Sequence, residues 1–129
     1  MKHSLGDVLE AISDSKSLEI IRDIAKGSVA SEVLKQKTGM SKKQYYTRTR
    51  QLMNTGIVKR VKGKFSLTNF GVVVYHGALI IDAGVRDYWK LKAIDSIEDS
   101  GQIVEHERTK LIQAILGGSS IENILVKQR

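Results

Sequence analysis

The sequence contains no cysteine among its 129 residues, which excludes disulfide bonds, thiolate metal sites and cysteine nucleophiles. It contains no proline either, and this favours long helices because proline is the residue that most often interrupts them. The longest apolar run, residues 72–81, is broken by His76 and Gly77, and it falls short of the roughly 18 residues that a membrane span needs. The first four residues lack the apolar centre of a signal peptide. These absences predict a soluble, cytoplasmic protein that does not enter the membrane.

Residues that carry enzyme chemistry are also scarce. The three histidines, His3, His76 and His106, are not spaced as metal ligands. The sequence has no phosphate-binding loop, nucleophile elbow or Ser/His/Asp grouping. The neighbouring carboxylates at 98–99 point in different directions on a helix, which is typical of a solvated surface. We therefore expect no enzymatic activity, no metal and no cofactor.

Acidic residues are missing from one long segment. Residues 33–81 contain no Asp or Glu. The whole chain has 21 basic and 14 acidic residues, so the remainder carries 11 basic and 14 acidic residues, a net charge of −3, and this segment alone supplies +10. Such clustering indicates a polyanionic partner more strongly than the overall charge does. The ten cations are Lys35, Lys37, Lys42, Lys43, Arg48, Arg50, Lys59, Arg60, Lys62 and Lys64.

The length of the chain and its 41% of apolar residues predict one folded domain with a core of its own. Ser4 is placed to cap a first helix that runs through Ser13, with an apolar stripe at helical spacing. The stripe consists of Leu5, Val8, Leu9 and Ile12.

Two further helices are expected between the first helix and the centre of the basic segment. The second starts at Asp14 or Ser15, and a short link that can form an edge strand follows it. A third helix, about residues 32–37, begins after a serine cap and turns Val33 and Leu34 inward. The inner face of the second helix consists of Leu18, Ile21, Ile24 and Ala25.

A glycine turn and a capping box mark the next helix. Gly39 permits the left-handed conformation that ends a helix. Ser41 and Gln44 then form a Ser-x-x-Gln capping box, which predicts a helix over residues 42–54. The spacing predicts an inward face of Tyr45, Thr49, Leu52 and Met53. It predicts an outward face of Lys42, Lys43, Gln44, Tyr46, Thr47 and Arg50.

A hairpin and a long helix complete the basic segment. Residues 57–67 alternate apolar and basic residues around a tight Lys62-Gly63-Lys64 turn, which predicts two strands with a basic tip. Thr68 then caps a helix from Asn69 to about Ala93 with apolar residues close to a heptad pattern. Twenty-five residues would extend about 37 Å, more than a small core requires. Close backbone approach is possible at Gly77, Ala78, Ala83 and Gly84.

The sequence after residue 95 predicts a tail of two shorter helices. One covers about residues 104–116, and Gly117-Gly118 forms a hinge after it. Ser119 and Glu122 then form a second capping box before a short final helix.

Three motifs together resemble the winged helix-turn-helix, in particular its archaeal regulators. They are Thr38-Gly39-Met40-Ser41, then Leu52-x-x-x-Gly56-Ile57-Val58-x-Arg60, and Phe65-Ser66-Leu67-Thr68-x-x-Gly71. The resemblance covers about residues 16–80. It implies a mainly α fold with a β-hairpin wing, and a DNA-binding transcriptional regulator or chromatin-associated protein that is often a homodimer through the helix after the wing. We accordingly expect a DNA-binding domain at residues 1–70, a dimerisation helix at 69–95 and a helical tail at 96–129.

An α-helix fits the major groove of B-form DNA, so the helix at 42–54 is the expected reader of double-stranded DNA. Its candidate contacts are Lys42, Lys43, Gln44, Tyr46, Thr47 and Arg50. The wing at 57–67 would contact phosphates or the minor groove through Arg60, Lys62 and Lys64. Lys35 and Lys37 are candidates for the flanking backbone.

Five alternatives remain open at this point. Gln44 can be occupied by its cap, and Tyr46 can pack against the protein instead of contacting DNA. The tail helices can fold back and bury the long helix within one chain. Finally, winged helices also serve as protein-interaction adaptors without sequence-specific DNA contact, and RNA would be preferred if single strands or A-form duplexes bound better than B-form DNA.

Overall fold

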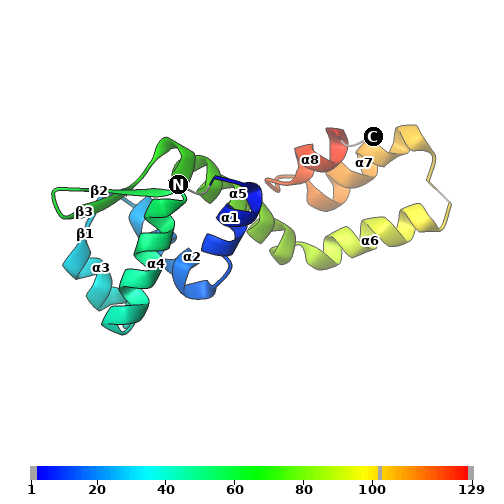
Figure 1. Ribbon diagram of the computed structural model, residues 1–129. Helices are drawn as coiled ribbons and strands as arrows, with labels where there is room; N and C mark the ends of the chain where they lie inside the picture. Colours follow the sequence, from blue (N-terminus) through cyan, green and yellow to red (C-terminus); the bar gives the residue numbers. More distant parts are fainter. Residues whose placement is uncertain (1–2, 102, 128–129) are drawn as a thin grey trace. The chain divides into compact units, whose positions relative to one another are not determined.

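The computed structural model describes residues 3–101 and 103–127 (Figure 1). These residues are mainly helical and include a three-stranded antiparallel sheet, which confirms the prediction of an α-rich fold with a small hairpin. The chain divides into two compact units between His76 and Gly77. Within the described ranges, no helix combines the length and the apolar character that crossing a membrane would require.

The first unit contains the sheet and most of the basic segment. The strands lie in the order β1-β3-β2, and Phe65 of the central strand pairs with Val29 on one side and Arg60 on the other. The elements of this unit are α1 (Leu5–Ala11), α2 (Ser15–Ala25), β1 (Val29–Ala30), α3 (Ser31–Thr38), α4 (Lys42–Asn54), β2 (Val58–Val61), β3 (Lys64–Leu67) and the beginning of α5 (Asn69–Arg86).

Local capping signals explain where the first helices begin. Ser4 caps α1 and forms a capping box with Asp7, while Asp14 caps α2 by accepting a hydrogen bond from the Ser17 N–H. The expected serine cap of α3 is wrong, because Ala30 occupies that position and no side chain caps the helix. Ser31 is buried instead, and its hydroxyl lies 3.1 Å from that of Tyr45.

The core of this unit gathers side chains from the helices and the sheet. Val33, predicted to face inward, lies on the surface and is 57% exposed, and Leu5 and Leu9 of the first apolar stripe are exposed as well. On the short helix α3, successive residues are about 100° apart, so burying Leu34 turns its neighbour toward solvent. The buried core consists of Val8, Ala11, Ile20, Ile21, Ile24, Leu34, Tyr45, Leu52, Ile57, Val58 and Phe65.

The junction between the hairpin and α5 explains the Thr-x-x-Gly motif. The Thr68 hydroxyl donates to the Gly56 carbonyl and accepts a 2.8 Å hydrogen bond from the Gly71 N–H. A side chain at Gly71 would collide with the Ile57 carbonyl oxygen. Glycine is therefore required where α5 starts against the strand.

The second unit contains the remainder of α5 with α6 (Tyr88–Asp99), α7 (Glu105–Leu116) and α8 (Glu122–Lys127). The prediction of one helix from Asn69 to about Ala93 is wrong, because the helix is interrupted at Asp87.

A side-chain contact accompanies this interruption. The Asp87 carboxylate accepts a 2.8 Å hydrogen bond from the Ser119 hydroxyl. The predicted second capping box is not seen among the described residues, because the Ser119 hydroxyl oxygen accepts a 3.4 Å hydrogen bond from the Ile121 N–H instead of that of Glu122, and α8 begins only at Glu122. The tail helices cover Ala83, but they leave Ile81, Val85 and Trp89 exposed, so the tail does not bury the long apolar face.

Candidate nucleic-acid interface

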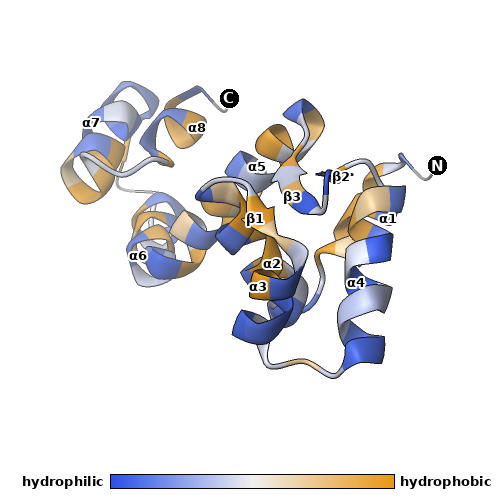
Figure 2. Ribbon diagram, turned by 90° about the vertical axis from the view of Figure 1, so that its left-hand side faces the viewer, coloured by the Kyte–Doolittle hydropathy of each residue, from blue (hydrophilic) through white to orange (hydrophobic). Residues whose placement is uncertain are grey.

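The rotation of α4 agrees with its predicted two faces. Tyr45, Thr49 and Leu52 are buried, and the Thr49 hydroxyl donates to the Tyr45 carbonyl at 3.0 Å. Figure 2 shows hydrophilic residues at the end of α4 that follows the turn. All six residues predicted to point outward are exposed: Lys42, Lys43, Gln44, Tyr46, Thr47 and Arg50.

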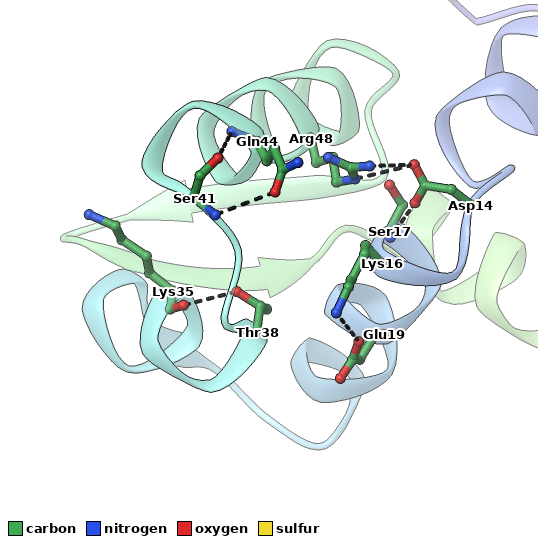
Figure 3. A network of polar contacts seen from close by, with 9 residues as sticks. All are labelled: Asp14, Lys16, Ser17, Glu19, Lys35, Thr38, Ser41, Gln44 and Arg48. Atoms are coloured by element: carbon green, nitrogen blue, oxygen red, sulfur yellow. Dashed lines mark hydrogen bonds and ion pairs between the residues drawn. The ribbon is translucent and has the colours of Figure 1, made fainter.

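The start of α4 is fixed by the predicted turn and capping box. Gly39 has a φ of 66° and ends α3 in the left-handed conformation. The Ser41 hydroxyl accepts from the Gln44 N–H at 3.2 Å, and the Gln44 side-chain oxygen lies 3.4 Å from the Ser41 nitrogen (Figure 3). Gln44 thus has a capping duty, although its amide N–H groups are left to donate to another partner.

Tyr46 combines packing with exposure. Its ring meets that of Tyr45 edge to face at 5.5 Å between centroids. The Lys35 ammonium lies 5.6 Å from the centre of the Tyr46 ring, within the range of a cation–π interaction. The ring therefore links α3 to α4, while part of it remains accessible to a ligand.

Two of the ten cations are held by carboxylates outside the acid-free segment. Arg48 contacts Asp14, with Nη2 at 3.1 Å from Oδ2. Lys37 lies 3.3 Å from the carboxylate of Asp23, a buried residue that also faces Lys26 at 3.8 Å. These contacts give Arg48 and Lys37 structural partners, and Lys37 is consequently a weaker candidate for a phosphate contact than the sequence predicted.

The remaining cations lie on α3, α4 and the hairpin. Arg60 stacks over Phe65 at 5.6 Å, much as Lys35 covers Tyr46. Among the described residues, the other six are exposed and take part in no ion pair within 4.0 Å. They are Lys42, Lys43, Arg50, Lys59, Lys62 and Lys64. Because α4 packs against β2, the helix and the hairpin present their charges from neighbouring elements.

The hairpin tip is a two-residue turn. Val61 pairs with Lys64, and the turn residues Lys62 and Gly63 have φ values of 52° and 75°. Two positive φ values in succession are typical of a type I′ turn. A lysine in this conformation is unusual, and it places a cation at the extreme end of the hairpin.

A cleft of about 330 Å³ borders the other end of α4. Thr47 and Arg50 line it together with Asp7 and Glu10 from α1. Carboxylates repel phosphates, so the side of α4 next to α1 is less suited to a polyanion than its first turn. In the described part of the chain, no three His, Asp or Glu side chains are grouped as a metal site.

The Asp14–Arg48 contact is the feature of this region that the sequence did not predict. A signal was present, because Arg48 falls three residues after Tyr45 and four before Leu52, on the face assigned to the core. A charged group on that face requires a partner. Asp14 lies 34 residues away in the chain, and nothing in the local sequence identifies it.

No family model matches the chain, and a search of curated proteins gives no match.

Proposed function

We propose that this protein binds double-stranded DNA as a winged-helix transcriptional regulator. In this proposal α4 enters the major groove, and the β2–β3 hairpin acts as the wing on the flanking backbone or minor groove. The observation that carries the proposal is the placement on α4 and the hairpin, two elements that pack together, of six exposed cations that form no ion pair with any described residue.

Different residues serve different parts of recognition. Gln44, Thr47 and Arg50 offer hydrogen-bonding groups suited to base edges, of which arginine pairs best with guanine and glutamine with adenine. Lysines on the hairpin, together with Arg60, suit phosphates and fix the register without reading sequence. If each protomer neutralises about five phosphates, the logarithm of the affinity should fall with the logarithm of the salt concentration with a slope of about −4 to −5.

The proposal includes a homodimer. Large apolar side chains on α5 and α6 remain exposed, and Trp89 is 79% exposed. A group of large exposed apolar side chains on one chain marks an interaction site. A twofold pair through this surface would place two α4 helices about one DNA turn, roughly 34 Å or a multiple, apart. The residues concerned are Val73, Ile80, Ile81, Val85, Tyr88 and Trp89.

The same apolar surface favours a second candidate, a protein-interaction adaptor within a transcription-related assembly. The two functions separate in a triple variant, Lys43→Ala, Arg50→Ala and Lys64→Ala. If the protein reads DNA, affinity for duplex DNA should fall by more than about tenfold, and the salt slope should become shallower by about two, one unit for each of the two lysines as a phosphate contact, while loss of Arg50 relaxes base preference.

A matched triple variant controls for the loss of net charge. Lys90, Lys92 and Lys110 are exposed residues of the second unit, and their replacement by alanine removes the same charge. We expect this control to change affinity only slightly, because these three lysines belong to neither α4 nor the hairpin. Unaltered duplex binding in the first variant would instead support the adaptor, as would a flat salt dependence of the wild type.

A further inference from the structure

The Asp14–Arg48 contact joins two elements that lie far apart in the sequence. Arg48 approaches a single oxygen of Asp14 with two nitrogens, Nε at 3.2 Å and Nη2 at 3.1 Å (Figure 3). The other carboxylate oxygen accepts a 2.7 Å hydrogen bond from the Ser17 N–H and so caps α2. One carboxylate therefore starts α2 and holds α4 at the same time.

The Asp14–Arg48 contact restrains the orientation of α4, which apolar packing does not do by itself. Tyr45 and Leu52 hold α4 against the core, but hydrophobic packing depends on buried area and has no preferred direction. A guanidinium is rigid and planar, and its two-nitrogen contact restricts the rotation of the side chain that carries it. The Arg48 side chain is only 25% exposed, so the contact is partly shielded from solvent.

The charge state of Asp14 suits this role. Burial raises the pKa of the carboxyl, but the hydrogen bonds from Ser17 and Arg48 together outweigh burial and leave the pKa below its ordinary value. Asp14 is therefore ionised throughout the neutral range, and its contact with Arg48 is charge-assisted.

We propose that the Asp14–Arg48 pair positions α4 for sequence-specific DNA recognition, and that Arg48 contacts no DNA itself. This inference rests on the proposed function of the chain. Base readout requires side chains held within roughly 0.5 Å and 10–20° of the productive geometry. A small rotation of α4 would displace Gln44 and Arg50 from base edges, whereas contacts to phosphates tolerate it better.

The test uses a variant for which charge and positioning predict opposite signs. Asp14→Asn retains an N-cap residue but removes a negative charge from a protein that binds a polyanion. Charge alone predicts tighter binding to every duplex. Positioning predicts about tenfold weaker binding to a duplex selected from random sequence by the wild type, with binding to a scrambled duplex unchanged or tighter.

Glu19→Gln is the matched control for charge. Glu19 lies on the same helix, its side chain is half-exposed as that of Asp14 is, and its one ion pair among the described residues is with Lys16 at 3.9 Å. Its replacement removes the same charge and leaves the α2–α4 contact in place. We expect Glu19→Gln to bind both duplexes equally well or slightly more tightly.

Arg48→Lys tests the other partner at constant net charge. Lysine keeps the positive charge but has a single nitrogen, so it does not reproduce the two-nitrogen contact. The selected duplex should bind about tenfold more weakly, with the salt slope unchanged because no phosphate contact is lost. Arg22→Lys, at an exposed position on α2, is its control and should bind as the wild type does.

The outcomes distinguish failure of the positioning role from failure of the proposed DNA-binding function. Tighter binding of the selected duplex by Asp14→Asn, or wild-type discrimination in Arg48→Lys, overturns the positioning role while DNA binding stands. A wild-type protein that does not prefer the selected duplex over the scrambled one overturns both. A salt slope shallower by about one unit in Arg48→Gln, which removes the charge, identifies Arg48 as a phosphate contact and refutes the assignment.

Discussion

Two glycines of the same helix should respond to alanine with opposite signs. Gly71 lies in the first turn of α5, where an added Cβ would collide with the Ile57 carbonyl oxygen and lie 2.9 Å from its carbon. That carbonyl accepts a 3.0 Å hydrogen bond from the Thr68 N–H, and the Thr68 hydroxyl, which donates to the Gly56 carbonyl, lies 3.1 Å from it. The Ile57 carbonyl cannot move away without weakening the hydrogen bond from the N–H. Gly84 lies later in α5, and no atom lies within 4 Å of the position that its Cβ would take.

The expected free energies follow from these surroundings. Alanine in place of glycine inside a helix stabilises by about 1 kcal/mol, and within a single chain nothing opposes that gain at Gly84, so the comparison is made at a concentration where the protein is monomeric. At Gly71 overpacking costs about 1–3 kcal/mol, and a weakened hydrogen bond costs about 1 kcal/mol more. We therefore expect Gly71→Ala to lower the free energy of unfolding by about 1–3 kcal/mol and Gly84→Ala to raise it by about 1 kcal/mol.

Urea unfolding followed by far-ultraviolet circular dichroism measures both variants. With a slope of about 1–3 kcal/mol per molar urea, the Gly71→Ala midpoint should fall by about 1 M. Because the chain has two units, which can unfold separately, hydrogen exchange of peptides should place the loss in the first unit. Equal midpoints for the two variants would refute the packing argument at the junction of the hairpin and α5.

Three further predictions concern the hairpin, the α2 cap and the dimer. Lys62→Asn should keep the stability of the turn, since asparagine tolerates positive φ, but weaken DNA binding by roughly tenfold or less; Lys62→Val should in addition lower the urea midpoint, because a β-branched residue is strained at a φ of 52°. The pKa of Asp14 is lowered by folding, so its stabilisation is present above the unfolded value of about 3.9 and is lost as pH falls through the folded value; acid titration should show the wild type and Asp14→Asn converging below about pH 4. Gly84→Ala should weaken self-association by about fivefold or more in sedimentation, because an added methyl obstructs close helix packing; an unchanged dimer would place the interface elsewhere.

Local signals predicted the parts of the fold that depend on neighbouring residues. The cap at Ser4, the capping box at Ser41 and the left-handed Gly39 follow from interactions within a single turn. The faces of α4 follow from helical periodicity over its 13 residues. Such features require no knowledge of what the element packs against, and they placed all six outward residues of α4 correctly.

Features that depend on distant partners could not be predicted in this way. The interruption at Asp87 accompanies a hydrogen bond from Ser119, 32 residues further along the chain. A heptad pattern does not reveal that hydrogen bond. The same holds for Arg48 and Asp14. On α3, which has eight residues, Val33 and Leu34 were equally plausible core residues, and only the packed structure distinguishes them.

Some cations of the acid-free segment pair with carboxylates and the others remain available. The number that remain limits how many phosphates this segment can contact. Asp14 and Asp23, both from α2 or its cap, engage Arg48 and Lys37. Of the ten cations, two are thus paired and eight remain. Eight phosphate contacts would give a salt slope of about −7 per protomer at most, and the contacts proposed above give about −4 to −5. Unless cations outside residues 33–81 also contact DNA, a steeper slope would require Arg48 or Lys37 to leave its carboxylate on binding DNA. In that case Asp14→Asn would lower the cost of release and tighten binding, the outcome opposite to the one that positioning predicts.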